Sequence, residues 1–295
     1  MNAPPMLHTP GHRTGSLWSE AWRRLRRNPL ALAGGSAILL LALMALGADW
    51  LAPTHYTTPH FEHPFALPNG TFLLGTDQLG RDVLSRMIYG AQISLTVGVV
   101  TECLVLLIGV PIGAVAGYYG GRLDMLLMRG VDVVYALPHL LCVILLMSVL
   151  GRGLFNIFLA IGLTAWVRVA RLTRAQILSL KEQEFCEAAR AAGAGPWTIV
   201  VRHLLPNALA PLIISSTFGI PEAIFTEAAL SFIGVGISPP TPSWGQMVGE
   251  NQQYIRSYWH LCVFPAAGIA TLMLAFTFLG DGLRDALDPR PHDTR

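Results

Sequence analysis

The stretch EAARAAGAGPWTIVVRHLLPN, residues 187–207, lies between two strongly apolar runs and differs from both in carrying charge. Residues 184–192, which include the first part of this stretch, are strong helix formers. Their alanines give the predicted helix one flat face with only small side chains. Gly193 to Pro196 then end that helix, because glycine supplies a left-handed cap and proline prevents continuation. A second helix from Trp197 leads into the next apolar run. We therefore predict a rigid elbow joined to a long apolar helix.

The composition decides which solvent surrounds the rest of the chain. Of its 295 residues, 53% are hydrophobic and 13% are charged, whereas a soluble domain carries about 25% charged residues. A helix that spans a bilayer needs about 20 apolar residues, and six runs approach this length: 30–51, 93–117, 133–150, 154–170, 207–233 and 261–280. The fourth run ends in Trp166, Arg168 and Arg171, an aromatic and basic membrane boundary. The sequence therefore predicts an all-α membrane protein with six transmembrane helices.

Lysine and arginine are unevenly divided between the two sides of these runs. With the N-terminus in the cytoplasm, only four of the 20 lie on the opposite side, namely Arg81, Arg86, Arg152 and Arg256. This is a strong positive-inside bias, so both termini and the elbow are expected in the cytoplasm. The expected parts are a cytoplasmic segment with an interfacial helix (1–29), a first transmembrane helix (30–52), a periplasmic loop (53–92), a transmembrane core that includes the elbow loop at about 181–207 (93–280), and a cytoplasmic tail (281–295).

The chain has a single lysine, Lys181, and no glycine precedes it in LSLKEQ. A phosphate-binding loop has the form GxxxxGK[ST], in which the lysine reaches the β and γ phosphates. The chain has no such loop, so this subunit is not expected to hydrolyse ATP by that machinery. No catalytic constellation is visible either, so we expect neither an enzyme nor a cofactor of its own. If ATP drives its function, a separate ATPase must bind the ATP and Mg²⁺, and this chain must carry a docking surface for it.

The elbow resembles the EAA motif of binding-protein-dependent ABC importer permeases: it has Glu187-Ala188-Ala189, then Gly193, then Leu205-Pro206, with His203 where isoleucine is usual. Three further stretches resemble the C-type permease subunit of dipeptide, oligopeptide and nickel importers: LLGTDQLGRDVLSRMIYGAQISLTVG (73–98), EAALSFIGVGISPPTPSWGQM (227–247) and LGDGLRDALDPR (279–290). They stand in the family's order, and the resemblance runs from about residue 17 to residue 290.

This resemblance implies the type I importer permease fold, also called MetI-like, in the inner membrane of a bacterium. It implies four kinds of partner: a second homologous permease that forms a heterodimer with this chain, two ABC ATPase subunits, an extracytoplasmic substrate-binding protein and the lipid bilayer. Nucleic acid is not expected as a partner. The elbow would be the coupling helix that docks on an ATPase, with these residues at the coupling positions: Glu187, Ala188, Ala189, Arg190, Gly193, Leu205 and Pro206.

The resemblance implies a peptide as the substrate, because peptides dominate this subgroup, with nickel or another small solute as the alternative. Nothing in the apolar runs separates these substrates. A different class, the stand-alone ion-coupled transporter, would show inverted repeats and intramembrane charge pairs. The sequence has no evident repeat and only isolated glutamates in its apolar runs.

One polar stripe follows the fifth apolar run. Ser215, Gly219, Glu222 and Thr226 recur at the spacing of a single helix face, which predicts a surface toward the translocation path or the second permease. Ionisable groups within spans are costly and are functional candidates by default. For Glu222 two uses stay open: a residue of the pathway or gate, and a hydrogen bond between subunits. Glu102 in the second run is expected to reach a neighbouring helix.

The loop between the last two runs combines glycine and proline with a terminal tryptophan. Such a loop holds a fixed shape and presents an aromatic side chain at the interface. The candidate contacts for the binding protein are therefore Pro239, Pro240, Pro242 and Trp244, with a purely structural turn as the alternative.

Acidic and basic residues alternate just before the second run, in GTDQLGRDVLSR (75–86). An Asp77–Arg81 or Asp82–Arg86 pair would lock the glycine turns together by charge-assisted hydrogen bonds, so we expect a structural cap here. The three histidines of the same loop match no compact ligand spacing, and no metal site is expected.

Overall fold

The computed structural model describes residues 17–287, and its regular structure in that range is helical apart from one isolated β-bridge between Thr76 and Asp82. The elements are α1 (Leu17–Leu25), α2 (Pro29–Leu46), α3 (Ala48–Leu51), α4 (Val83–Tyr119), α5 (Gly121–Tyr135), α6 (His139–Leu150), α7 (Leu154–Leu180), α8 (Glu184–Ala191), α9 (Pro196–Thr198), a π-helix (Ile199–Leu204), α10 (Leu205–Ile233), α11 (Trp244–Asn251), a 3₁₀-helix (Gln252–Tyr254) and α12 (His260–Leu287). The first part of the predicted N-terminal segment, 1–16, and most of the predicted tail, 288–295, lie outside the described residues.

Five described segments are long and apolar enough to cross a membrane: α2, α4, α7, α12, and α10 together with the two short helices before it. The pair α5 and α6 passes the same test only jointly, and it is bent by 84°. The single helix predicted over 133–150 is therefore wrong. Pro138 explains the break, because proline donates no hydrogen bond and disfavours a helical conformation of the residue before it. The predicted six spans are matched only if the bent pair counts as one broken span.

Several helices extend beyond the apolar runs that predicted them. α4 begins at Val83, so the outer loop is shorter than the predicted 53–92; Asp82 caps this helix by accepting from the Ser85 amide at 2.8 Å. α7 continues to Leu180, ten residues past the predicted run. Arg168, predicted at the membrane boundary, consequently lies near the middle of α7 and not at its end.

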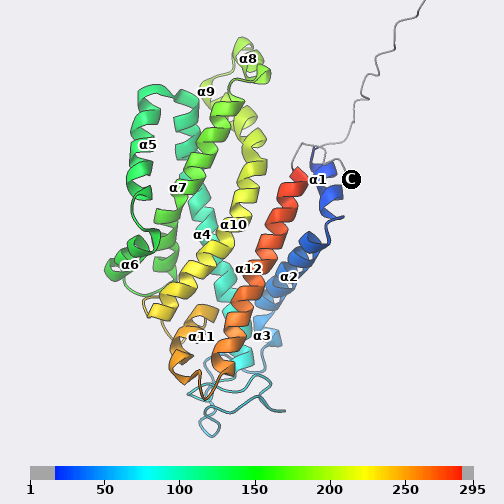
Figure 1. The fold of residues 1–295 in the computed structure, drawn as a ribbon, viewed down its shortest axis with the longest axis vertical. Coiled ribbons are helices and arrows are strands. Elements are labelled where there is room, and N and C mark those ends of the chain that lie inside the picture. Colours follow the sequence, from blue (N-terminus) through cyan, green and yellow to red (C-terminus); the bar gives the residue numbers. More distant parts are fainter. Residues whose placement is uncertain (1–16, 288–295) are drawn as a thin grey trace, which may run out of the picture.

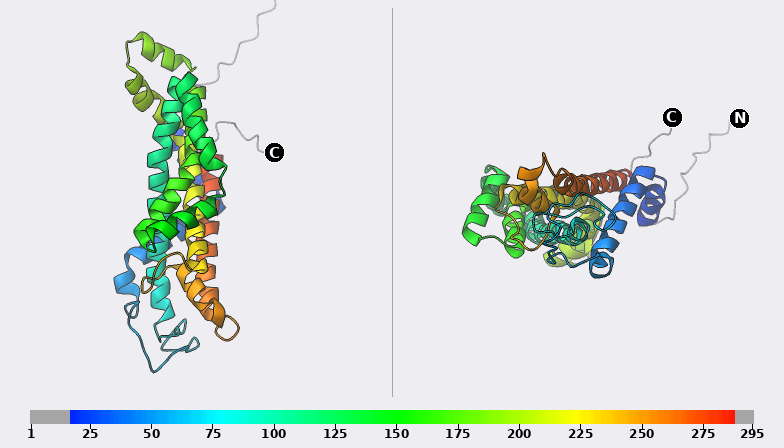
Figure 2. Two further views of the ribbon diagram at one scale, coloured as in Figure 1. Left: turned by 90° about the vertical axis from the view of Figure 1, so that its left-hand side faces the viewer. Right: turned by 90° about the horizontal axis from the view of Figure 1, so that it is seen from below.

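The long helices run roughly along one axis and form a bundle with two different ends (Figures 1 and 2). α8 and α9 project from one end, while α11 and the loop before α4 make up the other. α1 packs against α12, so both ends of the described chain lie toward the end that carries α8 (Figure 1). Termini on one side of a membrane require this arrangement. The side itself stays a prediction from the distribution of arginines.

Close contact between α4 and α7 depends on glycine. Gly109, Gly113 and Gly117 of α4 lie against α7, and a Cβ atom at Gly113 would be 2.3 Å from the carbonyl oxygen of Ala170. Small residues allow membrane helices to approach closely, and van der Waals packing then holds them together. α4 and α7 therefore form one packed unit.

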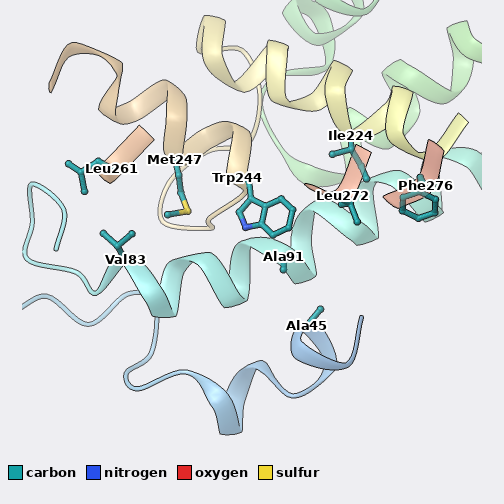
Figure 3. Close-up of a cluster of buried hydrophobic side chains, with 9 residues drawn as sticks. All are labelled: Ala45, Val83, Ala91, Ile224, Trp244, Met247, Leu261, Leu272 and Phe276. Atoms are coloured by element: carbon teal, nitrogen blue, oxygen red, sulfur yellow. The ribbon is translucent and has the colours of Figure 1, made fainter. Parts of the chain in front are cut away.

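Trp244 is the core residue at the end of the bundle formed by α11. Its side chain is 1% exposed and lies in a cluster with residues of α4 and α12 such as Val83 and Leu272 (Figure 3). Cβ atoms at Gly90 and Gly268 would be 3.0 and 3.1 Å from the indole ring, and its Nε1 donates to the Met87 carbonyl oxygen at 3.0 Å. Trp244 thus joins α4, α11 and α12.

Candidate functional site

α8 and α9 form the predicted elbow. α8 ends in a Schellman motif, in which the Gly193 amide donates to the Arg190 carbonyl oxygen at 2.9 Å and the Ala194 amide to the Ala189 carbonyl oxygen at 3.0 Å. Gly193 has a φ of 83°, in the left-handed region where a side chain is strained. Pro196 then opens α9. The predicted end of the first helix at glycine and the restart near proline are confirmed.

The outer face of the elbow includes four exposed residues that were predicted for docking: Glu187, Ala188, Arg190 and Gly193. Ala189 differs, because it is only 9% exposed. Its place on a docking surface is a wrong prediction. Ala189 lies three residues after Cys186, so both side chains share one helix face, and this face packs inward.

A cluster of buried apolar side chains, here called the inner cluster, attaches the elbow to the bundle. Its members come from α4, α7, α8 and the π-helix: Ala114, Ile177, Cys186, Ala189, Ile199, Val200 and Leu204. Interiors packed in this way resist compression. α8 is therefore packed against α7 and against the π-helix, which leads directly into α10.

The π-helix connects the elbow to α10. Leu205, which follows it, is half-buried, and Pro206 is exposed in the first turn of α10. Proline has no N–H for the carbonyl group four residues earlier, and its ring crowds that group. The wider π turn just before Pro206 relieves this crowding. Single π turns inside helices are frequent at functional sites.

The predicted polar stripe on α10 reaches the surface only in part. Glu222 is exposed, with 59% of its side chain accessible, and Ser215 is half-buried. Gly219 and Thr226 are buried within the chain, and a Cβ atom at Gly219 would lie 2.1 Å from Glu102 Oε2. The prediction that all four residues line a path is wrong for these two, because other parts of the same chain cover them.

The sequence interpretation missed the cation that accompanies the two glutamates. Arg168 Nη2 lies 3.8 Å from Glu102 Oε2 and 3.8 Å from Glu222 Oε2, and Nη1 donates to the Ser215 carbonyl oxygen at 3.2 Å. The arginine thereby joins α7 to α4 and α10. One feature of the sequence could have indicated this position. Apolar residues recur at helical spacing as far as Ile177, which indicates that the helix continues beyond the apolar run 154–170.

The loop from α10 to α11 is mainly structural. Of the four predicted contact residues, Pro239 and Pro240 are exposed, while Pro242 and Trp244 are buried. Trp244 has no free ring face to offer a partner, so this part of the prediction is wrong. The turn is held from inside by Glu227, whose Oε1 accepts hydrogen bonds from the Ser231 and Ser243 hydroxyl groups at 2.7 Å each.

A buried charge network ties the outer loop to the bundle. The predicted Asp77–Arg81 pair is confirmed, with Arg81 Nε 2.6 Å from Asp77 Oδ2. Arg86 does not pair with Asp82, which caps α4 instead. Arg86 Nη1 instead donates to the same Asp77 oxygen at 2.6 Å, and Arg86 Nη2 lies 3.0 Å from Glu250 Oε2 of α11. The expected structural cap therefore exists with a different second partner.

Two family matches cover most of the chain. Residues 109–293 match the binding-protein-dependent transport system inner membrane component, and residues 16–68 match the N-terminal TM domain of oligopeptide transport permease C. The chain belongs to the binding-protein-dependent transport permeases.

This permease has well-matched relatives. It is 45% identical over 276 residues to the dipeptide transport system permease protein DppC of Bacillus subtilis (strain 168), with 93% of this chain and 86% of that protein covered. It is 42% identical over 293 residues to the glutathione transport system permease protein GsiD of Escherichia coli O157:H7, with 98% and 95% covered.

A solved structure supports the fold of this permease. A chain of the methionine ABC transporter MetNI, in an inward-facing conformation, matches with a TM-score of 0.58 and 21% identity. The match covers 70% of this chain and 97% of that one. At this identity the likeness concerns the fold alone, and it agrees with the predicted MetI-like permease fold.

Proposed function

We propose that this permease is one half of the translocation pore of an ATP-driven peptide importer in the inner membrane of a bacterium. Relatives named for dipeptide and glutathione transport support the substrate class, since glutathione is itself a short peptide. The observation that carries the proposal is the elbow, whose outer face is exposed and whose inner face is packed onto the bundle. A chain without a phosphate-binding loop needs such a surface if ATP drives its movement.

In this proposal two ATPase subunits bind ATP and Mg²⁺, and each permease elbow docks on one of them. Ala188 allows another backbone to approach closely, and Glu187 and Arg190 offer charge on either side of it. Arg190 Nη2 also donates to the Lys181 carbonyl oxygen at 3.1 Å, which fixes α8 to the end of α7. Movement of the docked ATPase passes through the inner cluster to α10 and changes the side of the membrane that Glu222 faces.

The remaining partners have surfaces of matching chemistry. A mostly apolar groove between α4 and α10, lined by Leu107, Leu209 and Ile213 among others, suits a helix of the second, homologous permease. At the opposite end from the elbow, Pro239 and Pro240 are exposed. They are the two predicted contact residues that a substrate-binding protein can reach.

A stand-alone ion-coupled transporter is the second candidate function, because one observation favours it. Arg168 between two glutamates is a charge arrangement of the kind that serves as a relay inside membranes. Import of nickel or another small solute by the same ATP-driven architecture is a substrate alternative within the first proposal.

Reconstitution of the complete transporter separates these functions. The permease, a second permease, the ATPases and the binding protein are placed in proteoliposomes, and uptake of a labelled dipeptide is followed. Uptake is expected to require ATP and the binding protein and to be unaffected by ionophores that collapse ion gradients. Uptake by the purified chain alone, driven by an ion gradient, would overturn the proposal. Uptake of nickel chelates in place of dipeptides would retain the mechanism and change the substrate.

A further inference from the structure

Three ionisable side chains meet near the centre of the bundle and form what we call the mid-span cluster: Glu102 of α4, Arg168 of α7 and Glu222 of α10. The middle positions of these helices are 101, 167 and 219, so each charged residue lies within three positions of its helix centre. At a rise of 1.5 Å per residue, this is a distance of about 5 Å or less. Charged residues within membrane-spanning helices are costly and mark transport pathways or relays.

The mid-span cluster is loosely joined, and one carboxylate oxygen in it has no hydrogen-bond partner. Arg168 Nη2 is 3.8 Å from one oxygen of each carboxylate, beyond the limit of about 3.2 Å for an N–H···O hydrogen bond. Glu102 has only 5% of its side chain exposed, and its Oε1 has no hydrogen-bond partner. A buried acceptor without a donor is destabilising, so the arrangement is incomplete as it stands.

The surrounding backbone is shaped around these charges and leaves one side open. A Cβ atom at Gly219 would lie 2.1 Å from Glu102 Oε2 and 2.6 Å from Arg168 Nη2, so a larger residue there would displace both charged groups. Glu222 and Arg168 are in contrast 59% and 39% accessible at their side chains. A molecule that passes along α10 can therefore reach the cluster.

Glu222 is the accessible acidic group of the mid-span cluster, so the group that suits it is a cation that donates hydrogen bonds. An ammonium group has three donors on a compact centre. We propose that the cluster binds the N-terminal ammonium group of a peptide in transit, with Glu222 as the direct contact and Arg168 as the residue that positions it. This inference rests on the proposed function of peptide import.

The chemistry of the cluster fits a carrier of peptides with varied side chains. Every peptide with an unblocked N-terminus carries the ammonium group, whatever its sequence, so a site that recognises this group needs no pocket for side chains. Conduction also requires that binding be weak enough for release. Arg168 meets this requirement because it interacts with the same carboxylates and weakens their hold on the substrate.

The test uses the complete transporter in proteoliposomes and two labelled dipeptides that differ only in an N-terminal acetyl group. The wild type is expected to take up the free-amine dipeptide faster. Glu222→Gln keeps the shape of the side chain and removes its charge, and it is expected to lower free-amine uptake about tenfold, the effect of losing one charge-assisted contact. Acetylated uptake should stay unchanged.

Two further variants complete the comparison. Glu222→Asp keeps the charge and is expected to keep the preference for the free amine. Asp285→Asn removes one charge from an exposed position on α12, outside the elbow, and serves as the control. The same binding protein delivers both dipeptides to every variant, so its own preference cancels when each variant is compared with the wild type.

The outcomes separate this inference from the proposed function. If Glu222→Gln keeps the wild-type preference, the ammonium site is wrong and peptide import stands. If Glu222→Gln instead reduces the uptake of both dipeptides equally, and the second permease separates from it on size-exclusion chromatography, the inference is also overturned. Glu222 would then belong to a contact between subunits. Uptake of neither dipeptide by the wild type would overturn both.

Discussion

Glu187→Lys is expected to reduce peptide uptake by the assembled transporter about thirtyfold or more, because reversing a charge at a docked contact costs about 2–5 kcal/mol. The protein should still reach the membrane in normal amount. Glu187 is exposed on the outer face of the elbow, and surface substitutions of this kind change the free energy of unfolding by about 0.5 kcal/mol at most. The measurement is ATP-driven uptake beside ATP hydrolysis in the same proteoliposomes, with hydrolysis expected to continue.

Two more variants sharpen this test. Asp285→Lys makes the same charge reversal at an exposed residue of α12, outside the elbow, and near-normal uptake is expected from it. Gly193→Trp should act like Glu187→Lys, because the left-handed φ of Gly193 strains any side chain and the ring would also enter the space that a docked ATPase needs. Normal uptake by both elbow variants would show that the elbow is not the docking surface.

The elbow was predictable because its determinants are local. Glycine at position 193 adopts the left-handed conformation that ends α8, and Pro196 opens the next helix, so neighbours in the sequence decide both events. The long apolar runs were predictable for a similar reason, since a bilayer imposes a minimum length on any spanning helix.

The ends of the helices and the charge partners were not predictable in this way. Hydropathy reports where a helix is apolar, whereas α7 continues for ten residues beyond that point on a buried face. Arg168 therefore read as a boundary residue although it lies near the middle of α7. Its proximity to Glu102 and Glu222 depends on how three helices pack, and residues 66 and 54 positions away in the sequence carry no local sign of it.

Trp244 shows the same limit at the other end of the molecule. A tryptophan after a proline-rich loop is typical of a membrane interface, and the sequence around it supports that interpretation. The ring is buried instead, because Gly90 on α4 and Gly268 on α12 have no side chains and leave room for it between the helices. No pattern near Trp244 reveals those two glycines as its neighbours.

Trp244→Ala is accordingly expected to lower the free energy of unfolding by about 3–5 kcal/mol, the usual effect of removing a buried aromatic ring. The ring is 1% exposed, and its loss leaves a cavity that the backbone of α4 and α12 cannot fill without moving (Figure 3). The measurement is the fraction of purified permease that stays folded in detergent as temperature or denaturant concentration increases.

Trp50→Ala is the matched control, because Trp50 is 90% exposed and its removal should change stability by about 0.5 kcal/mol at most. The two interpretations of Trp244 then give opposite results. If Trp244 is a core residue, its truncation lowers the free energy of unfolding. A contact residue for the binding protein would leave stability unchanged and reduce only the stimulation of uptake by that protein. Stability of Trp244→Ala equal to that of Trp50→Ala would therefore restore the interface interpretation that the buried position of the ring now contradicts.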